Sequence, residues 1–160
     1  MFVDSIFHLG WITSVKQQQG CGSCTAFATN AAAEAALIKA GADFDSMDIS
    51  EQWLLNCSPY GGGCCGAWPP EYAQWVSTRG VLMMEGDYPY TQSSNKKDCK
   101  DGPYLNPGYK IDNFIHKNDC TDEEIMMQIK EHGSVVMTVV SGENGFTNDG
   151  GQGVFNGCTR

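Results

Sequence analysis

The sequence predicts an α+β protein in which a helical first part precedes a part that contains strands. Three stretches with clear helix signals occur in the first 80 residues, and a β-branched run, 134–140, follows a fourth helix signal. The hydrophobic content of 41% is enough for a packed core. A length of 160 residues fits one domain, or two small lobes that share a cleft.

The first predicted helix covers 24–40, which is rich in Ala, and Gly41 stands where a left-handed C-cap belongs. A second short helix is predicted over 50–57, with Ser50 as its N-cap. A third follows two prolines and covers 71–80. Three helices in this order predict a helical lobe at the start of the chain.

The connections and the last third complete the predicted architecture. Residues 58–70 are dense in Gly, Cys and Pro and predict a loop held by disulfides. Residues 121–133 predict a helix with an acidic first turn and a basic last turn, and 134–140 predict a buried strand. We place the boundary near Pro107–Gly108, so that 1–108 form the helical lobe and 109–160 a β-rich lobe.

Charge and hydropathy exclude several classes of partner. The formal net charge is −9 and the ten basic residues are scattered, so neither nucleic acid nor an anionic membrane is an expected partner. No apolar run approaches 18 residues, so we expect no membrane span. The first 11 residues lack the basic start and apolar core of a signal peptide, so any targeting segment is expected to lie outside this chain.

Eight cysteines among 160 residues are many for a protein of the reducing cytosol. Their spacing does not give the two CxxC pairs of a structural zinc site, and the histidines follow no ligand spacing. We therefore expect a disulfide framework, an oxidising compartment, and neither a metal nor another cofactor.

Residues 17–27, QQQGCGSCTAF, place Cys24 at the start of the first helix, where free N–H groups and the helix dipole favour a thiolate. Three other interpretations remain open: a Cys21–Cys24 redox pair, a zinc ligand, and two structural disulfides. A redox pair would need a strand that leads directly into the helix, and the preceding residues favour one only weakly. A nucleophilic Cys24 with amide donors nearby is the favoured interpretation.

Five segments in co-linear order resemble the papain-like (cathepsin-like) cysteine protease family. VKQQQGCGSCTAF resembles the nucleophile segment, and ISEQWLLNCS resembles a helix of the family. GGGCCGAWPP is similar to the family's cleft-wall loop. DYPYTQSSNKKDCK and GQGVFNGC are similar to a Tyr-Pro-Tyr segment and to the stretch before the catalytic histidine. The resemblance implies a papain-like two-lobe fold, a helical left lobe with an incomplete β-rich right lobe, and a lysosomal, vacuolar or secreted location.

The resemblance also implies roles for individual residues in the hydrolysis of a peptide or protein substrate. Cys24 would be the nucleophile, and Gln18 would join the Cys24 backbone N–H in the oxyanion hole. Five residues would bind substrate, the first two through their backbone and the rest by lining a pocket: Gly66, Ala67, Trp68, Pro69 and Thr138. The implied disulfides are Cys21–Cys64 and Cys57–Cys99, and a Cys65–Cys120 bridge would close the count once Cys158 is set aside.

Several positions depart from the family pattern. Thr25 replaces a tryptophan, Gln19 replaces a glycine, and Ala67 replaces a second glycine, which a positive φ would strain. The general base is absent, because none of His8, His116 and His132 matches the motif. We expect a second chain or a missing C-terminal segment to supply it and to complete the right lobe. The alternative is a catalytically inactive relative used for binding or assembly.

Overall fold

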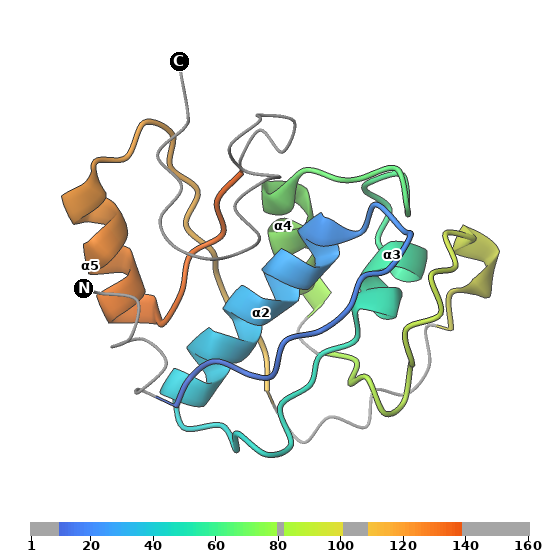
Figure 1. Cartoon of the computed structure of the whole chain (residues 1–160), viewed down its shortest axis with the longest axis horizontal. Coiled ribbons are helices and arrows are strands. Elements are labelled where there is room, and N and C mark those ends of the chain that lie inside the picture. Colours follow the sequence, from blue (N-terminus) through green and yellow to red (C-terminus); the bar gives the residue numbers. More distant parts are fainter. Residues whose placement is uncertain (1–9, 80–81, 101–108, 139–160) are drawn as a thin grey trace.

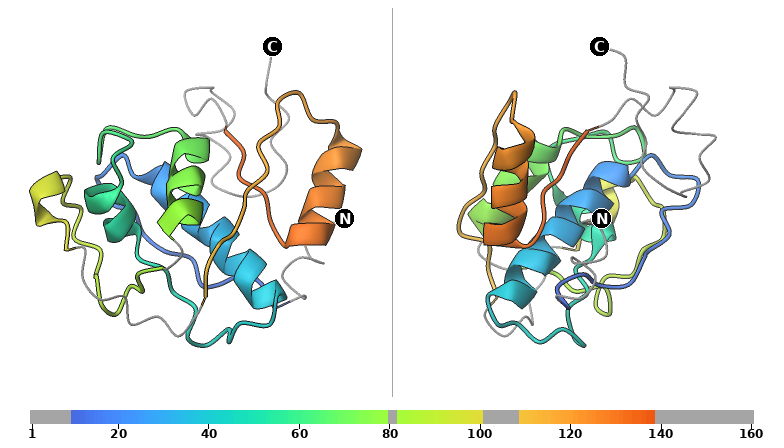
Figure 2. Two further views of the ribbon diagram at one scale, coloured as in Figure 1. Left: turned by 180° about the vertical axis from the view of Figure 1, so that it is seen from behind. Right: turned by 60° about the vertical axis from the view of Figure 1, so that its left-hand side comes forward.

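The structure, a computed structural model, describes residues 10–79, 82–100 and 109–138. Its helices are α2 (Cys24–Lys39), α3 (Glu51–Cys57), α4 (Pro69–Arg79), the 3-10 helix η1 (Lys96–Asp98) and α5 (Asp122–His132). Helix α2 runs diagonally through the molecule and contacts α3, α4 and α5 (Figures 1 and 2). Helices α3 and α4 lie on one side of α2, and α5 lies on the other side (Figure 1).

Helix α2 forms because alanine dominates its sequence and no Gly or Pro interrupts it. It ends at Lys39 with Ala40 as its C-cap, and Gly41 follows with a φ of +102°, the left-handed conformation that the sequence predicted. Helix α3 begins at Ser50, whose hydroxyl accepts a hydrogen bond from the Trp53 N–H and donates one to the Tyr88 carbonyl. These caps confirm the start of α3 and the end of α2.

The core lies where α2, α3 and α4 meet. Trp53 from α3 and Trp75 from α4 pack with ring centroids 4.5 Å apart and ring planes tilted by 48°, and Ile49, Leu54 and Leu55 are fully buried in the same core. Large aromatic side chains supply much of the buried apolar area in a core of this size. The hydrophobic core of the described chain therefore lies within the helical lobe.

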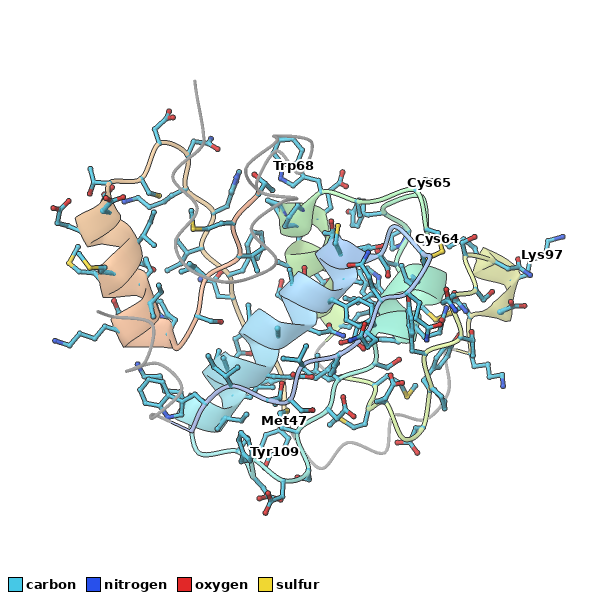
Figure 3. All side chains as sticks on the ribbon, viewed as in Figure 1. Met47, Cys64, Cys65, Trp68, Lys97 and Tyr109 are labelled. Atoms are coloured by element: carbon cyan, nitrogen blue, oxygen red, sulfur yellow. A yellow bond between two sulfur atoms is a disulfide. The ribbon has the colours of Figure 1, made fainter. Side chains whose placement is uncertain are left out.

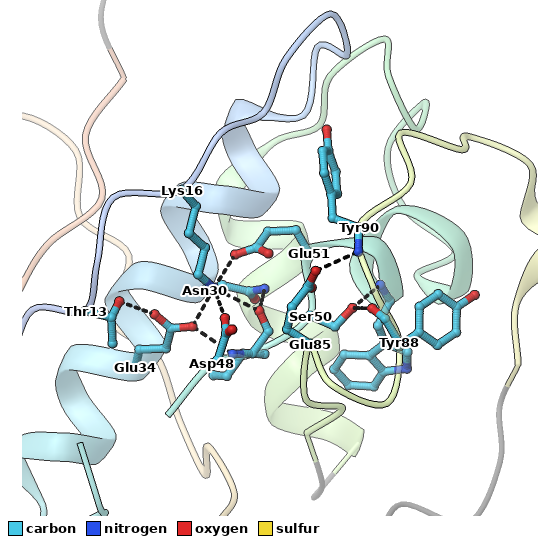
Figure 4. Close-up of polar contacts among 12 residues, drawn as sticks. Thr13, Lys16, Asn30, Glu34, Asp48, Ser50, Glu51, Glu85, Tyr88 and Tyr90 are labelled. Carbon is cyan, nitrogen blue, oxygen red and sulfur yellow. Dashed lines mark hydrogen bonds and ion pairs between the residues drawn. The ribbon is translucent and has the colours of Figure 1, made fainter. Parts of the chain in front are cut away.

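A buried ion cluster ties the N-terminal segment to the helical core (Figure 4). The Lys16 ammonium lies 2.9 Å from carboxylate oxygens of both Glu34 and Glu51, and 2.6 Å from Asp48. Glu34 also accepts hydrogen bonds from the Ile49 N–H and the Thr13 hydroxyl. The Glu34 carboxylate thus has three donors, and the Glu51 carboxylate is paired with Lys16, so neither buried charge is left without a partner.

The pKa values in this cluster follow from burial and charge. Burial lowers the pKa of Lys16, but the hydrogen bond to Asp48 and the charges of Glu34 and Glu51 outweigh it, so the pKa of Lys16 is raised. Burial raises the pKa of Glu51, and Lys16 only partly offsets that rise. Lys16 therefore remains charged at neutral pH and neutralises part of the buried acidic charge.

The last described segment contains a well-capped helix but no strand. Thr121 and Glu124 form a capping box at the start of α5, as the acidic first turn predicted. The predicted buried strand over 134–140 is wrong for its described part, because 134–138 pair with no strand and Met137 is 62% exposed. The only β pairings among the described residues are isolated bridges, Gly22 with Cys65 and Ile49 with Met84. A β-branched run forms a strand only when a neighbouring strand takes up its backbone groups.

We predict that Glu34→Gln lowers the free energy of unfolding by about 2 kcal/mol or more, because Lys16 loses a buried counter-charge. Asp112→Asn is the control, since its ion pair with Lys110 is exposed and should contribute no more than about 0.5 kcal/mol. Urea unfolding at an unchanged m-value measures both. Equal effects of the two substitutions would show that the cluster does not stabilise the core.

Candidate active site

Cys24 is the first residue of α2, and its thiol is free and exposed. The backbone N–H groups of the first helical turn point toward this end of the helix, and those of Ala26 and Phe27 donate to the carbonyl of the N-cap residue, Ser23. The preceding residue, Ser23, is buried and shares a hydrogen bond of 2.8 Å with the Tyr90 hydroxyl. The helix start is therefore anchored in the core, while the thiol next to it remains accessible.

Gln18 lies in the loop that leads to α2. Its side-chain Nε2 donates to the Cys21 carbonyl at 3.0 Å, and its own carbonyl accepts from the Tyr90 hydroxyl at 2.8 Å. These bonds fix both the backbone and the side chain of Gln18. Because a side-chain amide has two N–H groups, one remains free after the bond to Cys21.

Gln19, which stands where the family has glycine, adopts a φ of +56°. L-residues other than Gly, Asn and Asp rarely adopt this left-handed conformation. The Gln92 side chain holds it there, since it donates to the Gln19 side chain and accepts from the Gly20 N–H. Gln19 at this glycine position therefore strains the backbone, and the two hydrogen bonds made by Gln92 help to hold the strained conformation.

The loop between α3 and α4 runs beside the nucleophile segment (Figure 3). The Cys21–Cys64 disulfide joins them, and the Gly22 N–H donates to the Cys64 carbonyl at 3.1 Å. A Cβ on Gly22 would lie 2.4 Å from that carbonyl oxygen, so only glycine permits this approach. Segment 21–25 and segment 64–67 thus lie against each other.

The residues expected to bind substrate occupy the end of this loop. Gly66 has a φ of +92°, whereas Ala67 is not among the residues with positive φ, so its methyl group causes no strain there. Pro69 is the first residue of α4. Trp68 is 59% exposed and lies near the start of α4, on the same loop as Cys64 and Cys65 (Figure 3).

Thr138 is an exposed residue at the end of the last described segment, and no hydrogen bond within the described residues joins it to the other four. The sequence indicated neither of two further features of the site. The Thr25 hydroxyl donates to the Ala67 carbonyl at 2.9 Å, and the ring of His116 lies edge-on to Trp68 with centroids 6.3 Å apart. Position 25 had been identified only as a departure from the family, and His116 only as a poor match for a catalytic base.

The structure contains both disulfides that the resemblance implied, Cys21–Cys64 and Cys57–Cys99. A Cys21–Cys24 redox pair is excluded, because Cys21 is bonded to Cys64. The suggested Cys65–Cys120 bridge is wrong, because both thiols are free. Cys65 is exposed, while the neighbouring Cys64 is bonded to Cys21.

Some expected features lie outside the described residues, including His8, Cys158, the 151–158 motif and the Pro107–Gly108 boundary. Within 10–79, 82–100 and 109–138, no group of three or more His, Cys, Asp or Glu side chains is placed to hold a metal ion. Across the same residues, every helix is too short or too polar to cross a membrane.

The family model described as papain family cysteine protease matches residues 3–160. The chain belongs to the papain family. Zingipain-1 of Zingiber officinale is 38% identical over 119 residues, which are 74% of this chain and 51% of that protein. Cathepsin 7 of Mus musculus is 31% identical over 134 residues, 81% of this chain and 38% of that protein.

Solved structures agree with this assignment. The Carica candamarcensis cysteine protease CMS1MS2 in complex with E-64 has a TM-score of 0.67 at 28% identity, over 78% of this chain and 56% of that chain. The bromelain protease from Ananas comosus in complex with E64 has a TM-score of 0.55 at 31% identity, over 65% of this chain and 46% of that chain. The chain thus spans about half the length of these relatives or less. Its described helices correspond to the helical lobe of the papain fold.

We predict that Gln19→Gly raises the free energy of unfolding by about 0.5–1 kcal/mol, because glycine adopts a positive φ without strain. Gln17→Gly is the matched control, since Gln17 is not among the residues with positive φ. Its only effect should be the entropic cost of glycine, a loss of about 0.5–1 kcal/mol. Thermal and urea unfolding measure both variants, and a loss at position 19 would disprove the strain.

A second prediction concerns Tyr72, which is 1% exposed and lies beneath the loop between α3 and α4, residues 58–68, which we call the wall loop. Its hydroxyl has no hydrogen-bond partner among the described residues. Tyr72→Phe should not destabilise the protein at pH 7. Tyr88→Phe is the control and should cost about 1–2 kcal/mol, because the Tyr88 hydroxyl donates to the Asp98 carbonyl and accepts from Asn56.

The pH dependence of the same pair of variants gives a second measurement. Burial raises the pKa of Tyr72 to about 12, from a usual value of 10.0. The folded state therefore holds its proton where the unfolded state has lost it, and stability falls as the pH rises from about 10 through 12. Tyr72→Phe should lack this part of the alkaline loss, and a full wild-type loss in that variant would contradict the assignment.

Proposed function

We propose that this chain carries the nucleophile side of a cysteine peptidase active site, in which Cys24 attacks the scissile carbonyl of a peptide or protein substrate. The observation that supports this most directly is a free, exposed thiol at the first residue of α2, beside a wall that a disulfide joins to the same segment. Membership of the papain family supports the reaction class.

The proposed reaction has two steps. The Cys24 thiol loses its proton to the general base, its sulfur forms a bond to the carbonyl carbon, the C–N bond breaks, and the leaving amine takes that proton from the base. Water then cleaves the thioester, which releases the acid and restores the thiol. The Cys24 backbone N–H and the second N–H of the Gln18 amide are the proposed donors to the oxyanion.

The substrate would lie along the wall loop as an extended strand. The backbones of Gly66 and Ala67 would pair with it, and Trp68, Pro69 and Thr138 would form the pocket for a side chain. Trp68 is suited to this role because more than half of its surface is exposed next to the loop that would hold the backbone.

The general base is proposed to come from outside these 160 residues. His116 lies edge-on to Trp68 and His132 is the last residue of α5, and neither histidine matches the family's catalytic motif. A second chain or a further segment would bring the histidine to Cys24 and complete the right lobe. The disulfides and the cathepsin-like relatives support a lysosomal, vacuolar or extracellular compartment.

The second candidate function is that of an inactive papain-family protein whose cleft serves in binding or assembly. Thr25 in place of a tryptophan beside the nucleophile favours it, as does the strained Gln19 in the segment that carries Gln18. Both candidates keep the wall loop and the disulfides. They differ in the reactivity of one thiol.

We predict that a peptidyl epoxide labels Cys24 in the natural protein at least about a hundred times faster than it labels Cys65 or Cys120, because a paired thiolate reacts far faster than an ordinary thiol. Mass spectrometry of the intact protein and of its peptides locates the adduct. Cys24→Ser is the matched control and should lose both the label and peptide hydrolysis. Equal, slow labelling of all three thiols would instead favour the inactive candidate.

A further inference from the structure

Thr25 stands next to the nucleophile and makes a contact that links two parts of the proposed cleft. It is the second residue of α2 and only 9% exposed, and its hydroxyl donates to the Ala67 carbonyl at 2.9 Å. A threonine deeper inside a helix commonly bonds back to a carbonyl one turn earlier, which the helix does not offer to a residue of its first turn. Thr25 instead bonds across to the wall loop.

The position of this bond allows it to restrain the wall loop against α2. The Cys21–Cys64 disulfide and the bond from the Gly22 N–H to the Cys64 carbonyl hold one end of the wall segment. Gly66 follows these contacts in the chain and has a positive φ. Glycine restricts the backbone less than a residue with a side chain would, so the loop is least constrained at this position. The Thr25 bond attaches the far side of this glycine to α2, one residue from Cys24.

The Ala67 carbonyl is also a group that the proposed function assigns to the substrate backbone. A carbonyl oxygen has two lone pairs, so it can accept from Thr25 and from a substrate N–H at the same time. The bond from Thr25 sets the direction of this carbonyl before any substrate arrives. Because the carbonyl is already held in one direction, substrate binding does not pay the entropic cost of ordering it, and affinity is higher by that amount.

We propose that Thr25 is a positioning residue for substrate binding: its hydroxyl bond to Ala67 fixes the cleft wall at a set distance from Cys24. This inference rests on the proposed function, since it concerns the same cleft. The short hydroxyl side chain performs this attachment where the family has a tryptophan ring. Thr25 itself touches neither the substrate nor the reacting atoms.

The test compares two reagents at one thiol. A peptidyl epoxide needs the wall as well as the thiol, whereas iodoacetamide needs only the thiol. The ratio of their second-order rate constants at Cys24, mapped by mass spectrometry in a Cys65→Ser background of the natural protein, therefore isolates the contribution of the wall.

Thr25→Val removes the hydroxyl and keeps the branched shape, and should lower the ratio about three- to tenfold, the change expected for the loss of one neutral hydrogen bond. With a peptide substrate, KM should rise by a similar factor and kcat should change by less than about twofold. Thr25→Ser keeps the hydroxyl and should restore the wild-type ratio. Thr25→Ala serves as a second hydroxyl-free variant if the valine cannot be accommodated.

Thr13→Val is the matched control, because the Thr13 hydroxyl bonds to Glu34 in the ion cluster and not to the wall. It should leave the ratio unchanged even if it lowers stability. An unchanged ratio in Thr25→Val, or an equal fall in both rate constants, would overturn the inference while Cys24 remains a nucleophile. A wild-type Cys24 that shows no preference for the peptidyl reagent would overturn the proposed function and this inference with it.

Discussion

The Cys21–Cys64 disulfide is the constraint on which the arrangement of the site depends. It joins the segment just before α2 to the loop just before α4, across 43 residues of chain. In the chain-entropy account, closing a loop of that length destabilises the unfolded state by about 4 kcal/mol. Its geometric effect is as important, because it places the wall loop within hydrogen-bond distance of Gly22 and Thr25.

The other contacts between these segments extend from that bridge. Gly22 can approach the Cys64 carbonyl only because it has no side chain, and it forms an isolated parallel bridge with Cys65. From the first turn of α2, the Thr25 hydroxyl reaches the Ala67 carbonyl two residues beyond that bridge. The exposed thiol of Cys24 lies between these two contacts in the sequence. Contacts on both sides of Cys24 therefore hold the site to the helical lobe, which is stabilised by its own core and by the Lys16 ion cluster.

The two parts of the described chain differ in how much they bury. Helices α2, α3 and α4 share tryptophans, aliphatic side chains and the Lys16 cluster, whereas no residue of α5 is buried and Met126 and Met127 are more than half exposed. Most of the burial that stabilises the fold thus lies before residue 100, while the segment after 109 adds a well-capped but peripheral helix. This division agrees with a chain that matches only part of its relatives' length.

The sequence by itself determined the helices, their caps and the family. Alanine content, Ser50, Gly41 and the acidic first turn of α5 act over a few residues, so local pattern predicts them reliably. Only the tertiary structure decided three other matters: the bond from Thr25 to Ala67, the free state of Cys65, and the failure of 134–138 to form a strand. Each depends on which distant backbone or sulfur atom lies within reach, and no spacing within one segment of the sequence contains that information.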